Sequence, residues 1–251
     1  MDFTPPYETV DSLKVRLKEM YDAVEIGNVK GIAWFVCWWG GNKMSFFENT
    51  KKPEGLGGKI MVAMMNSGHS KLADWGMSFL GLSTDAAVLD CGCGGGANLC
   101  KLLKRCPNGI VTGIDYSSVS VEKSKKLNAK TISEGRCCVL ETSVAVLPFE
   151  DNKFDMVTAF ETVYFWPGLV DCFREVYRVT KTGGIFLICN EATGDTNKND
   201  KWTQIISDMT IYRDVQLKTA LEEAGFTDIQ IHKNAHQDWL CVTGQKQEKL
   251  G

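Results

Sequence analysis

Short apolar runs separated by amphipathic stretches dominate the chain from residue 86 onward. Short apolar runs bounded by turn residues are typical of buried strands, while apolar positions three and four residues apart are typical of helices. Strands that alternate with helices predict an α/β domain with a mainly parallel sheet. The predicted strands cover residues 86–90, 109–114, 136–141, 156–160 and 182–188, and the predicted helices cover residues 98–104, 117–130, 168–180 and 214–224.

The C-terminal pattern differs from the strand and helix alternation before it. Residues 226–233 and 238–244 are two strand-like runs joined by a short loop, which predicts a hairpin. Gly225 stands directly before them, where it can end the preceding helix in a left-handed conformation. The hairpin therefore predicts one antiparallel strand at the end of an otherwise parallel sheet.

The first 80 residues follow a weaker pattern. Residues 11–26 predict a helix with an imperfect apolar stripe. Residues 27–58 are rich in aromatic side chains and glycine, a composition that suits a lid over a site, a layer packed on the sheet, or a dimer contact. A further helix is predicted over residues 58–80, with an interruption at Gly68-His69. Outside this region, a short helix is also predicted over residues 202–209, between the fifth strand and the helix over residues 214–224.

A glycine-rich turn after the first predicted strand of the α/β region is the most informative stretch. Asp90 ends that strand, and Gly92, Gly94 and Gly96 follow it, so the backbone can turn tightly and approach a ligand closely. Asp115 ends the next strand, at about the 20-residue separation expected for a carboxylate that accepts hydrogen bonds from ribose hydroxyls. The sequence therefore predicts a nucleotide-binding βαβ unit. Its glycine pattern also suits NAD, so an NAD(P)-dependent oxidoreductase is one alternative.

The carboxylate of Asp90 distinguishes between the two kinds of cofactor. It stands two residues before the first glycine, where it would repel a pyrophosphate and attract an ammonium or sulfonium group. A dehydrogenase also needs a Tyr-x-x-x-Lys or similar set after the fourth strand, which residues 164–168 do not supply. A non-catalytic cofactor-binding interaction module is the second alternative, with the aromatic segment as its partner surface.

Two motifs resemble one family. Val88, Leu89, Asp90 and the three glycines resemble the first motif of class I S-adenosylmethionine-dependent methyltransferases. The stretch 147–160, with Leu-Pro-Phe, a polar loop, Phe-Asp and a strand, resembles the region around the fourth strand of the same family.

The resemblance covers about residues 58–245 and is to the small-molecule branch of that family. It implies an α/β, Rossmann-like, doubly wound sheet of seven strands, mostly parallel with an antiparallel last strand, and an N-terminal helical cap. Residues 1–57 are expected to form the cap or lid, and residues 58–251 the methyltransferase domain. The implied activity is methyl transfer to a small-molecule acceptor by in-line displacement, with S-adenosylmethionine as cofactor and S-adenosylhomocysteine as product.

The resemblance also implies which residues contact the cofactor. Asp90 and the glycine turn would lie along its methionine part, Asp115 would bind both ribose hydroxyls, and Tyr116 would lie beside the adenine. Ser143 departs from the family, which often has an acidic residue at that position for the adenine amino group. The implied cofactor-binding residues are Asp90, Gly92, Cys93, Gly94, Gly96, Asp115, Tyr116, Ser117, Ser143, Val144 and Glu161.

Four residues are candidates for contact with the acceptor. His69 and Tyr164 are the candidate general bases, although a lone histidine is more often structural. Tyr164 and Trp166 could form a substrate wall or simply pack at a turn, and both interpretations stay open. Trp38, in the aromatic segment, is a substrate-binding candidate if that segment is a lid.

Composition excludes several other classes. The net charge of −3, without a basic stripe, argues against a nucleic-acid substrate. Ten cysteines and an N-terminus unlike a signal peptide indicate reduced thiols in a cytoplasmic protein, and no metal site is predicted. The longest aromatic and apolar run, residues 32–39, is too short to span a bilayer. The expected partner is a small-molecule acceptor, and the expected state is a monomer or homodimer.

Overall fold

A computed structural model describes residues 69–248, apart from 195–202, 204, 205, 207 and 235, together with residues 15, 17–19, 23–29, 32–39 and 42–45. Within residues 69–248, strands and helices alternate as the apolar pattern predicts. The elements are α3 (Ser70–Met77), β4 (Ala87–Cys91), α4 (Ala97–Arg105), β5 (Ile110–Asp115), α5 (Ser118–Leu127), α6 (Ala129–Ser133), β6 (Cys137–Glu141), β7 (Phe154–Phe160), the 3-10 turn η2 (Val163–Phe165), α7 (Leu169–Val179), β8 (Thr180–Asn190), α9 (Asp214–Ala224), β9 (Thr227–Lys233) and β10 (Leu240–Gln245).

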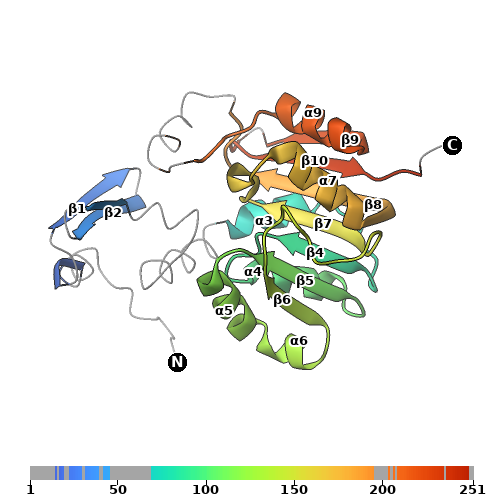
Figure 1. The fold of residues 1–251 in the computed structure, drawn as a ribbon, viewed down its shortest axis with the longest axis horizontal. Helices are drawn as coiled ribbons and strands as arrows, with labels where there is room; N and C mark the ends of the chain where they lie inside the picture. The colour runs from blue at the N-terminus through green and yellow to red at the C-terminus, as the bar shows by residue number, and fades with distance from the viewer. Residues whose placement is uncertain are drawn as a thin grey trace.

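The strands of this region form a seven-stranded sheet in the order β6-β5-β4-β7-β8-β10-β9 (Figure 1). Neighbouring strands from β6 to β8 are parallel, and β10 is antiparallel to both β8 and β9. This confirms the predicted seven-stranded sheet with an antiparallel last strand. The chain runs outward from β4 to β6 and then returns to the other side of β4 at β7, so the strand order reverses between β4 and β7. Ligands of such sheets bind at the carboxyl ends of the strands beside this reversal.

Helices cover both faces of the sheet, and each face has its own apolar core. Side chains of successive strand residues point to opposite faces. Thus Leu89 packs with α7 and α9, whereas Val88 packs with α3, α4 and α5. Among the described residues, no helix is long and apolar enough to cross a bilayer.

The structure corrects the end of the predicted N-terminal helix, whose described residues 15 and 17–19 are helical. Residues 23–26, placed at the end of that helix, belong to strand β1 (Ala23–Val29). This strand pairs antiparallel with β2 (Ile32–Trp39), which in turn pairs with β3 (Asn42–Ser45). Branched and aromatic side chains favour extended backbone, which explains the strands. The Lys30-Gly31 and Gly40-Gly41 dipeptides between the paired ends were the missed hairpin signals.

Other boundaries differ from the prediction in smaller ways. The helix predicted over residues 117–130 ends at Asn128, whose buried amide donates to the carbonyls of Gly96 and Ser124, and α6 begins anew after it. Of the helix predicted over residues 58–80, only the part after Gly68 lies within the described residues, where it is α3. The short helix predicted over 202–209 lies mostly outside them.

Phe186 lies at the centre of the aromatic packing beneath α7. Its ring stacks on Trp166 at 6.1 Å and meets Phe173 edge to face at 5.3 Å, and it is fully buried. We expect Phe186→Ala to lower the free energy of unfolding by about 3–5 kcal/mol, because it removes a buried ring and leaves a cavity. Chemical denaturation measures this loss. Val146→Ala, at a side chain that is 73% exposed, is the control and should change it by less than about 0.5 kcal/mol.

Candidate active site

The turn between β4 and α4 lies against the carboxyl end of β5. The backbone amides of Gly92 and Cys93 both donate to the carbonyl of Ile114, each at 2.8 Å. Gly92, Gly94 and Gly96 have φ angles of +76°, +52° and +81°, values that residues other than glycine rarely adopt. The shape of the turn therefore depends on these three residues.

The three glycines have different surroundings. A Cβ atom at Gly92 would lie 2.2 Å from Oγ1 of Thr162, and one at Gly96 would lie 2.4 Å from Oγ of Ser124. These two glycines are required by close packing. A Cβ at Gly94 would meet no atom of the described residues within 4 Å, so within this part of the chain its backbone borders open space. Gly94 is thus the point at which a ligand can approach the turn.

Asp115 fixes the turn from the end of β5. Its Oδ2 accepts a hydrogen bond from the Gly94 amide and its Oδ1 accepts one from the Ser117 amide, both at 2.9 Å. The side chain is largely buried, and burial raises its pKa against the opposing effect of these bonds. A carboxylate offers about four acceptor positions, so two backbone bonds leave capacity for a ligand.

Asp90 is more deeply buried, with 1% of its surface exposed. Its Oδ1 accepts a hydrogen bond of 2.7 Å from the hydroxyl of Thr158, whereas its Oδ2 is buried and has no hydrogen-bond partner among the described residues. Burial raises the pKa of this carboxyl to about 7. A buried carboxylate oxygen without a partner is costly, and a positively charged donor would remove that cost.

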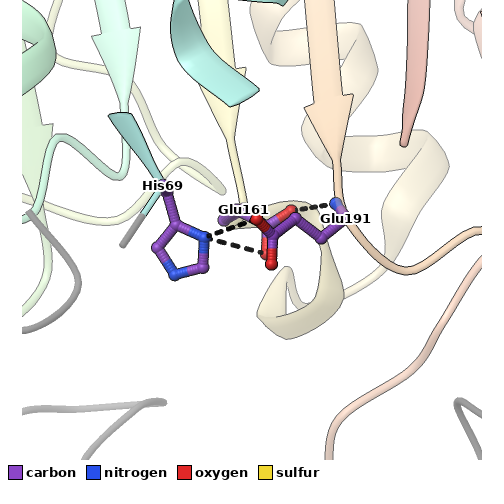
Figure 2. Close-up of side chains that lie close together, drawn as sticks. All are labelled: His69, Glu161 and Glu191. Atoms are coloured by element: carbon purple, nitrogen blue, oxygen red, sulfur yellow. Dashed lines mark hydrogen bonds and ion pairs between the residues drawn. The ribbon is translucent and has the colours of Figure 1, made fainter. Parts of the chain in front are cut away.

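A second polar group lies at the ends of β7 and β8 (Figure 2). His69 directly precedes α3, Glu161 follows β7, and Glu191 follows β8. The Nδ1 atom of His69 lies 3.7 Å from Oε2 of Glu161 and 3.6 Å from Oε1 of Glu191. We call these three side chains the imidazole–carboxylate cluster. One candidate atom from each lies within 4.8 Å of the others.

Hydrogen bonds hold Glu161 in this cluster. Its Oε1 accepts a bond of 3.1 Å from the hydroxyl of Tyr164 and another from the amide of Glu191. The same hydroxyl accepts a bond of 3.0 Å from the amide of Ala192. Glu161 has a φ of +57°, a strained conformation for a residue other than glycine. The backbone and its neighbours thus determine where this carboxylate lies.

Burial and charge shift the pKa values within the cluster. Burial raises the pKa of Glu161 to about 7, although His69 opposes the rise. Burial lowers the pKa of His69, but the carboxylates of Glu191 and Glu161 raise it, and the net change is upward. Burial raises the pKa of the Tyr164 phenol well above its ordinary value. The Tyr164 hydroxyl therefore acts as a hydrogen-bond donor to Glu161.

The remaining predicted site residues divide by their surroundings. Tyr116 is 38% exposed beside the turn, and the Ser143 hydroxyl accepts a bond of 3.2 Å from the Ala145 amide. The side chains of Cys93 and Val144 belong to the two apolar cores, so Cys93 offers a ligand only its backbone. Ser117 is buried and caps α5 through the Ser120 amide.

The tryptophan candidates lie elsewhere. Trp166 is 7% exposed, packs on Phe173 and Phe186, and donates from Nε1 to the Thr162 hydroxyl at 3.2 Å. These contacts favour packing at a turn over a substrate wall for Trp166. Trp38 belongs to β2, and its side chain lies outside the described residues.

Sequence reasoning missed Asn190 and Glu191. The amide nitrogen and oxygen of Asn190 are fully buried and have no hydrogen-bond partner in the described part of the chain. The predicted fifth strand ended at residue 188, whereas β8 continues to Asn190. The sequence did contain a signal for them, because two polar residues at the carboxyl end of a parallel strand indicate a ligand site. The same reasoning had already identified Glu161.

Comparison with known proteins shows which proteins part of this chain resembles. Residues 89–188 match the family model described as a methyltransferase domain. Cycloartenol-C-24-methyltransferase of Arabidopsis thaliana is 31% identical over 156 residues, which are 59% of this chain and 46% of that protein. Squalene methyltransferase 1 of Botryococcus braunii is 33% identical over 109 residues, 43% of this chain and 29% of that protein. The chain therefore spans less than half the length of these relatives.

Solved structures share the fold. A Haloferax volcanii putative methyltransferase, solved with its Trm112 activator, has a TM-score of 0.66 at 18% identity and covers 76% of this chain and 97% of its own. Geranyl diphosphate C-methyltransferase from Streptomyces coelicolor A3(2) has a TM-score of 0.62 at 14% identity and covers 77% of this chain and 85% of its own. Together with the sheet order described above, these likenesses show the fold of a class I methyltransferase, and residues 89–188, which begin just before the glycine turn, match the methyltransferase domain model.

Proposed function

We propose that this protein transfers a methyl group from S-adenosylmethionine to a small-molecule acceptor. The observation that carries the proposal is the pair of buried carboxylates on either side of the open turn at Gly94, with Oδ2 of Asp90 lacking a partner. The relatives named above are a cycloartenol-C-24-methyltransferase and a squalene methyltransferase, which supports a small apolar acceptor. Because this chain spans only part of those proteins, the acceptor itself is part of the proposal.

The residues around the turn fit the proposed cofactor. The Asp90 carboxylate would bind its ammonium group, the backbone at Gly94 would border its methionine part, and Asp115 would bind the ribose hydroxyls through its remaining acceptor positions. The cofactor supplies an electrophilic methyl group on a sulfonium. Tyr116, half exposed beside Asp115, would lie against the adenine, with Ser143 and Val144 near its far edge.

The imidazole–carboxylate cluster would lie on the acceptor side of this site. Methyl transfer is an in-line displacement, so the protein's contribution is to align the acceptor atom with the methyl group at about 3–3.5 Å and to exclude water. We assign His69, which is partly exposed, to contact with the acceptor and to the uptake of its proton at a ring nitrogen. Tyr164 is assigned a positioning role, because its hydroxyl bonds to Glu161.

The organisation of the whole chain belongs to the same proposal. Residues 58–251 would form the catalytic domain and residues 1–57 a cap or lid, for which the described strands β1 to β3 supply a three-stranded sheet. Nine cysteines within the described residues are free thiols, which supports a cytoplasmic location. The protein would act as a monomer or homodimer.

Calorimetric titration tests the cofactor directly. S-adenosylhomocysteine and S-adenosylmethionine should bind with micromolar affinity, whereas NADH should produce no heat of binding. NADH binding in place of the other two would reject the proposal and favour the oxidoreductase alternative. The absence of binding by all three would favour the interaction module.

Removal of the Asp115 carboxylate should weaken cofactor binding. We expect Asp115→Ala to raise the Kd for S-adenosylmethionine by one to two orders of magnitude, about 1.5–3 kcal/mol for a charged acceptor. Asp171→Ala, on the exposed surface of α7, is the control and should bind as the wild type does. An unchanged Kd for Asp115→Ala would contradict its role at the ribose.

A side chain at Gly94 should block the site while the fold persists. We expect Gly94→Val to abolish cofactor binding, because its side chain would enter the open space at the turn. Gly135→Val is a matched control, since Gly135 has a φ of +73° and a Cβ there also meets nothing within 4 Å. Both variants should show similar unfolding midpoints and circular dichroism spectra. Retention of binding by Gly94→Val would mean that the turn does not border the ligand.

Asp90 should oppose stability while it supports binding. Its folded-state pKa is raised above the unfolded value, so ionisation of the buried carboxyl costs stability as the pH rises toward 7. We expect Asp90→Asn to raise the free energy of unfolding at pH 8 by up to about 4 kcal/mol, and by less at pH 5. The same variant should bind S-adenosylmethionine at least tenfold more weakly.

Denaturation at both pH values and calorimetry measure the two effects of Asp90→Asn. A variant that is less stable than the wild type at pH 8 would show that the buried charge is already compensated in the free protein. Wild-type affinity in the variant would exclude Asp90 as the partner of the ammonium group.

A further inference from the structure

We propose that the imidazole–carboxylate cluster of His69, Glu161 and Glu191 binds a divalent transition-metal ion. The three residues come from separate segments that the fold brings together at the ends of β7 and β8 (Figure 2). Figure 2 shows the His69 ring facing both carboxylates across a short gap. One candidate ligand atom from each residue lies within 4.8 Å of the other two.

The distances suit metal coordination after a small contraction. Nδ1 of His69 lies 3.7 Å from Oε2 of Glu161 and 3.6 Å from Oε1 of Glu191. Nitrogen and oxygen ligands at about 2.1 Å from a metal are separated by about 3.4 Å in tetrahedral geometry and about 3.0 Å between neighbouring octahedral positions. The two nitrogen–oxygen separations therefore need a contraction of a few tenths of an ångström. The two carboxylate oxygens lie within 4.8 Å of each other and would move together on binding the ion.

The surroundings orient two of the ligand atoms. Oε1 of Glu161 is occupied by the Tyr164 hydroxyl and the Glu191 amide, which leaves Oε2 directed toward His69. Such outer contacts commonly fix the orientation of metal-ligating carboxylates. Nδ1 of His69 is shielded from solvent and has no hydrogen-bond partner among the described residues, although it faces two carboxylates. A metal ion would satisfy this nitrogen. His69 would then serve as a ligand in place of the proton acceptor of the proposed function, because the metal-bound neutral ring carries its proton on Nε2.

The negative charge of the cluster also favours a bound cation. Glu161 and Glu191 place two carboxylates next to each other, with side-chain exposures of 14% and 42%. In the described part of the chain, neither of them forms an ion pair with a lysine or arginine. Two neighbouring carboxylates repel each other unless a cation or a shared proton lies between them. A divalent ion neutralises both.

The ligand types select the kind of metal. One imidazole nitrogen and two carboxylate oxygens suit Mn²⁺, Fe²⁺, Co²⁺ or Zn²⁺, whereas Mg²⁺ and Ca²⁺ favour sites made entirely of oxygen. Three protein ligands leave at least one coordination position open. An oxygen atom of the methyl acceptor would occupy it, a step that rests on the proposed function, whereas metal binding itself does not.

Mn²⁺ binding tests the site without the cofactor. The full chain is first treated with a chelator, and electron paramagnetic resonance then measures free Mn²⁺ during titration. Mn²⁺ is the chosen probe because it has little affinity for the cysteine thiols of this chain. One Mn²⁺ should bind per chain, and His69→Ala, Glu161→Gln and Glu191→Gln should each raise its Kd at least tenfold.

Two exposed residues of the same types provide matched controls. His236→Ala and Glu223→Gln alter a histidine and a glutamate far from the cluster in the sequence, and both should retain wild-type Mn²⁺ affinity. Circular dichroism and the unfolding midpoint show whether the cluster variants fold. If Glu161→Gln fails to fold, His69→Ala and Glu191→Gln still decide the result, because these side chains are more exposed.

Calorimetry with S-adenosylmethionine separates this inference from the proposed function. Loss of Mn²⁺ binding in His69→Ala and Glu191→Gln, with cofactor binding retained, would support the metal site. No Mn²⁺ binding by the wild type, or equal binding by the cluster variants, would overturn it and indicate a shared proton between the carboxylates. Cofactor binding by the wild type in that case would leave the proposed function intact.

Discussion

The contact between the β4–α4 turn and the end of β5 is the constraint on which the rest of the site depends. Two amides of the turn share the carbonyl of Ile114, and a third amide, from Gly94, bonds to the carboxylate of Asp115. These bonds hold the turn in a backbone conformation that only glycine adopts readily. Thr162, which follows β7, packs against Gly92, and Ser124 of α5 packs against Gly96. The turn therefore also determines how closely β7 and α5 can pack against it. Only the middle glycine remains open to a ligand.

Polar groups without partners gather at the same edge of the sheet. The buried side-chain atoms without hydrogen bonds, among the described residues, belong to His69, Asp90 and Asn190. Each such group costs about 1–3 kcal/mol, so this edge lowers the stability of the free protein. The two apolar cores on either face of the sheet offset the cost. Such a concentration of unsatisfied groups is typical of a site whose ligands supply the missing partners.

The sequence predicted the site correctly where local chain geometry allows only one type of residue at a position. Glycines at fixed offsets after an apolar run, with an acidic residue at the end of the next run, predicted the turn and Asp115, because local chain geometry determines both. Alternation of apolar runs likewise predicted an α/β domain with a mainly parallel sheet, and the family resemblance implied its seven strands. The imidazole–carboxylate cluster could not be predicted in the same way. His69, Glu161 and Glu191 are far apart in the sequence, and their proximity results from the side-by-side positions of β7 and β8 and from the start of α3.

The N-terminal strands show a different reason for failure. The apolar spacing of residues 11–26 matched a helix imperfectly, while the glycine-containing dipeptides at 30–31 and 40–41 were the stronger sequence signal. A short amphipathic stretch can satisfy either period, and pairing with β2 decided the outcome for residues 23–26.

Four acidic side chains lie at the carboxyl edge of the sheet: Asp90, Asp115, Glu161 and Glu191. Burial raises the pKa of Asp90, Asp115 and Glu161, which shows that the free protein does not supply enough positive charge to stabilise their ionised forms. Ligands that carry positive charge are therefore favoured at this edge, and anionic ligands such as a pyrophosphate are disfavoured. In the sequence, Asp90 alone distinguished a sulfonium cofactor from a dinucleotide. In the structure, the negative charge extends across the ends of four strands, β4, β5, β7 and β8. The same accumulation of carboxylates at one edge would favour the proposed methyl donor at the glycine turn and, through the geometry of His69, Glu161 and Glu191, the proposed metal ion.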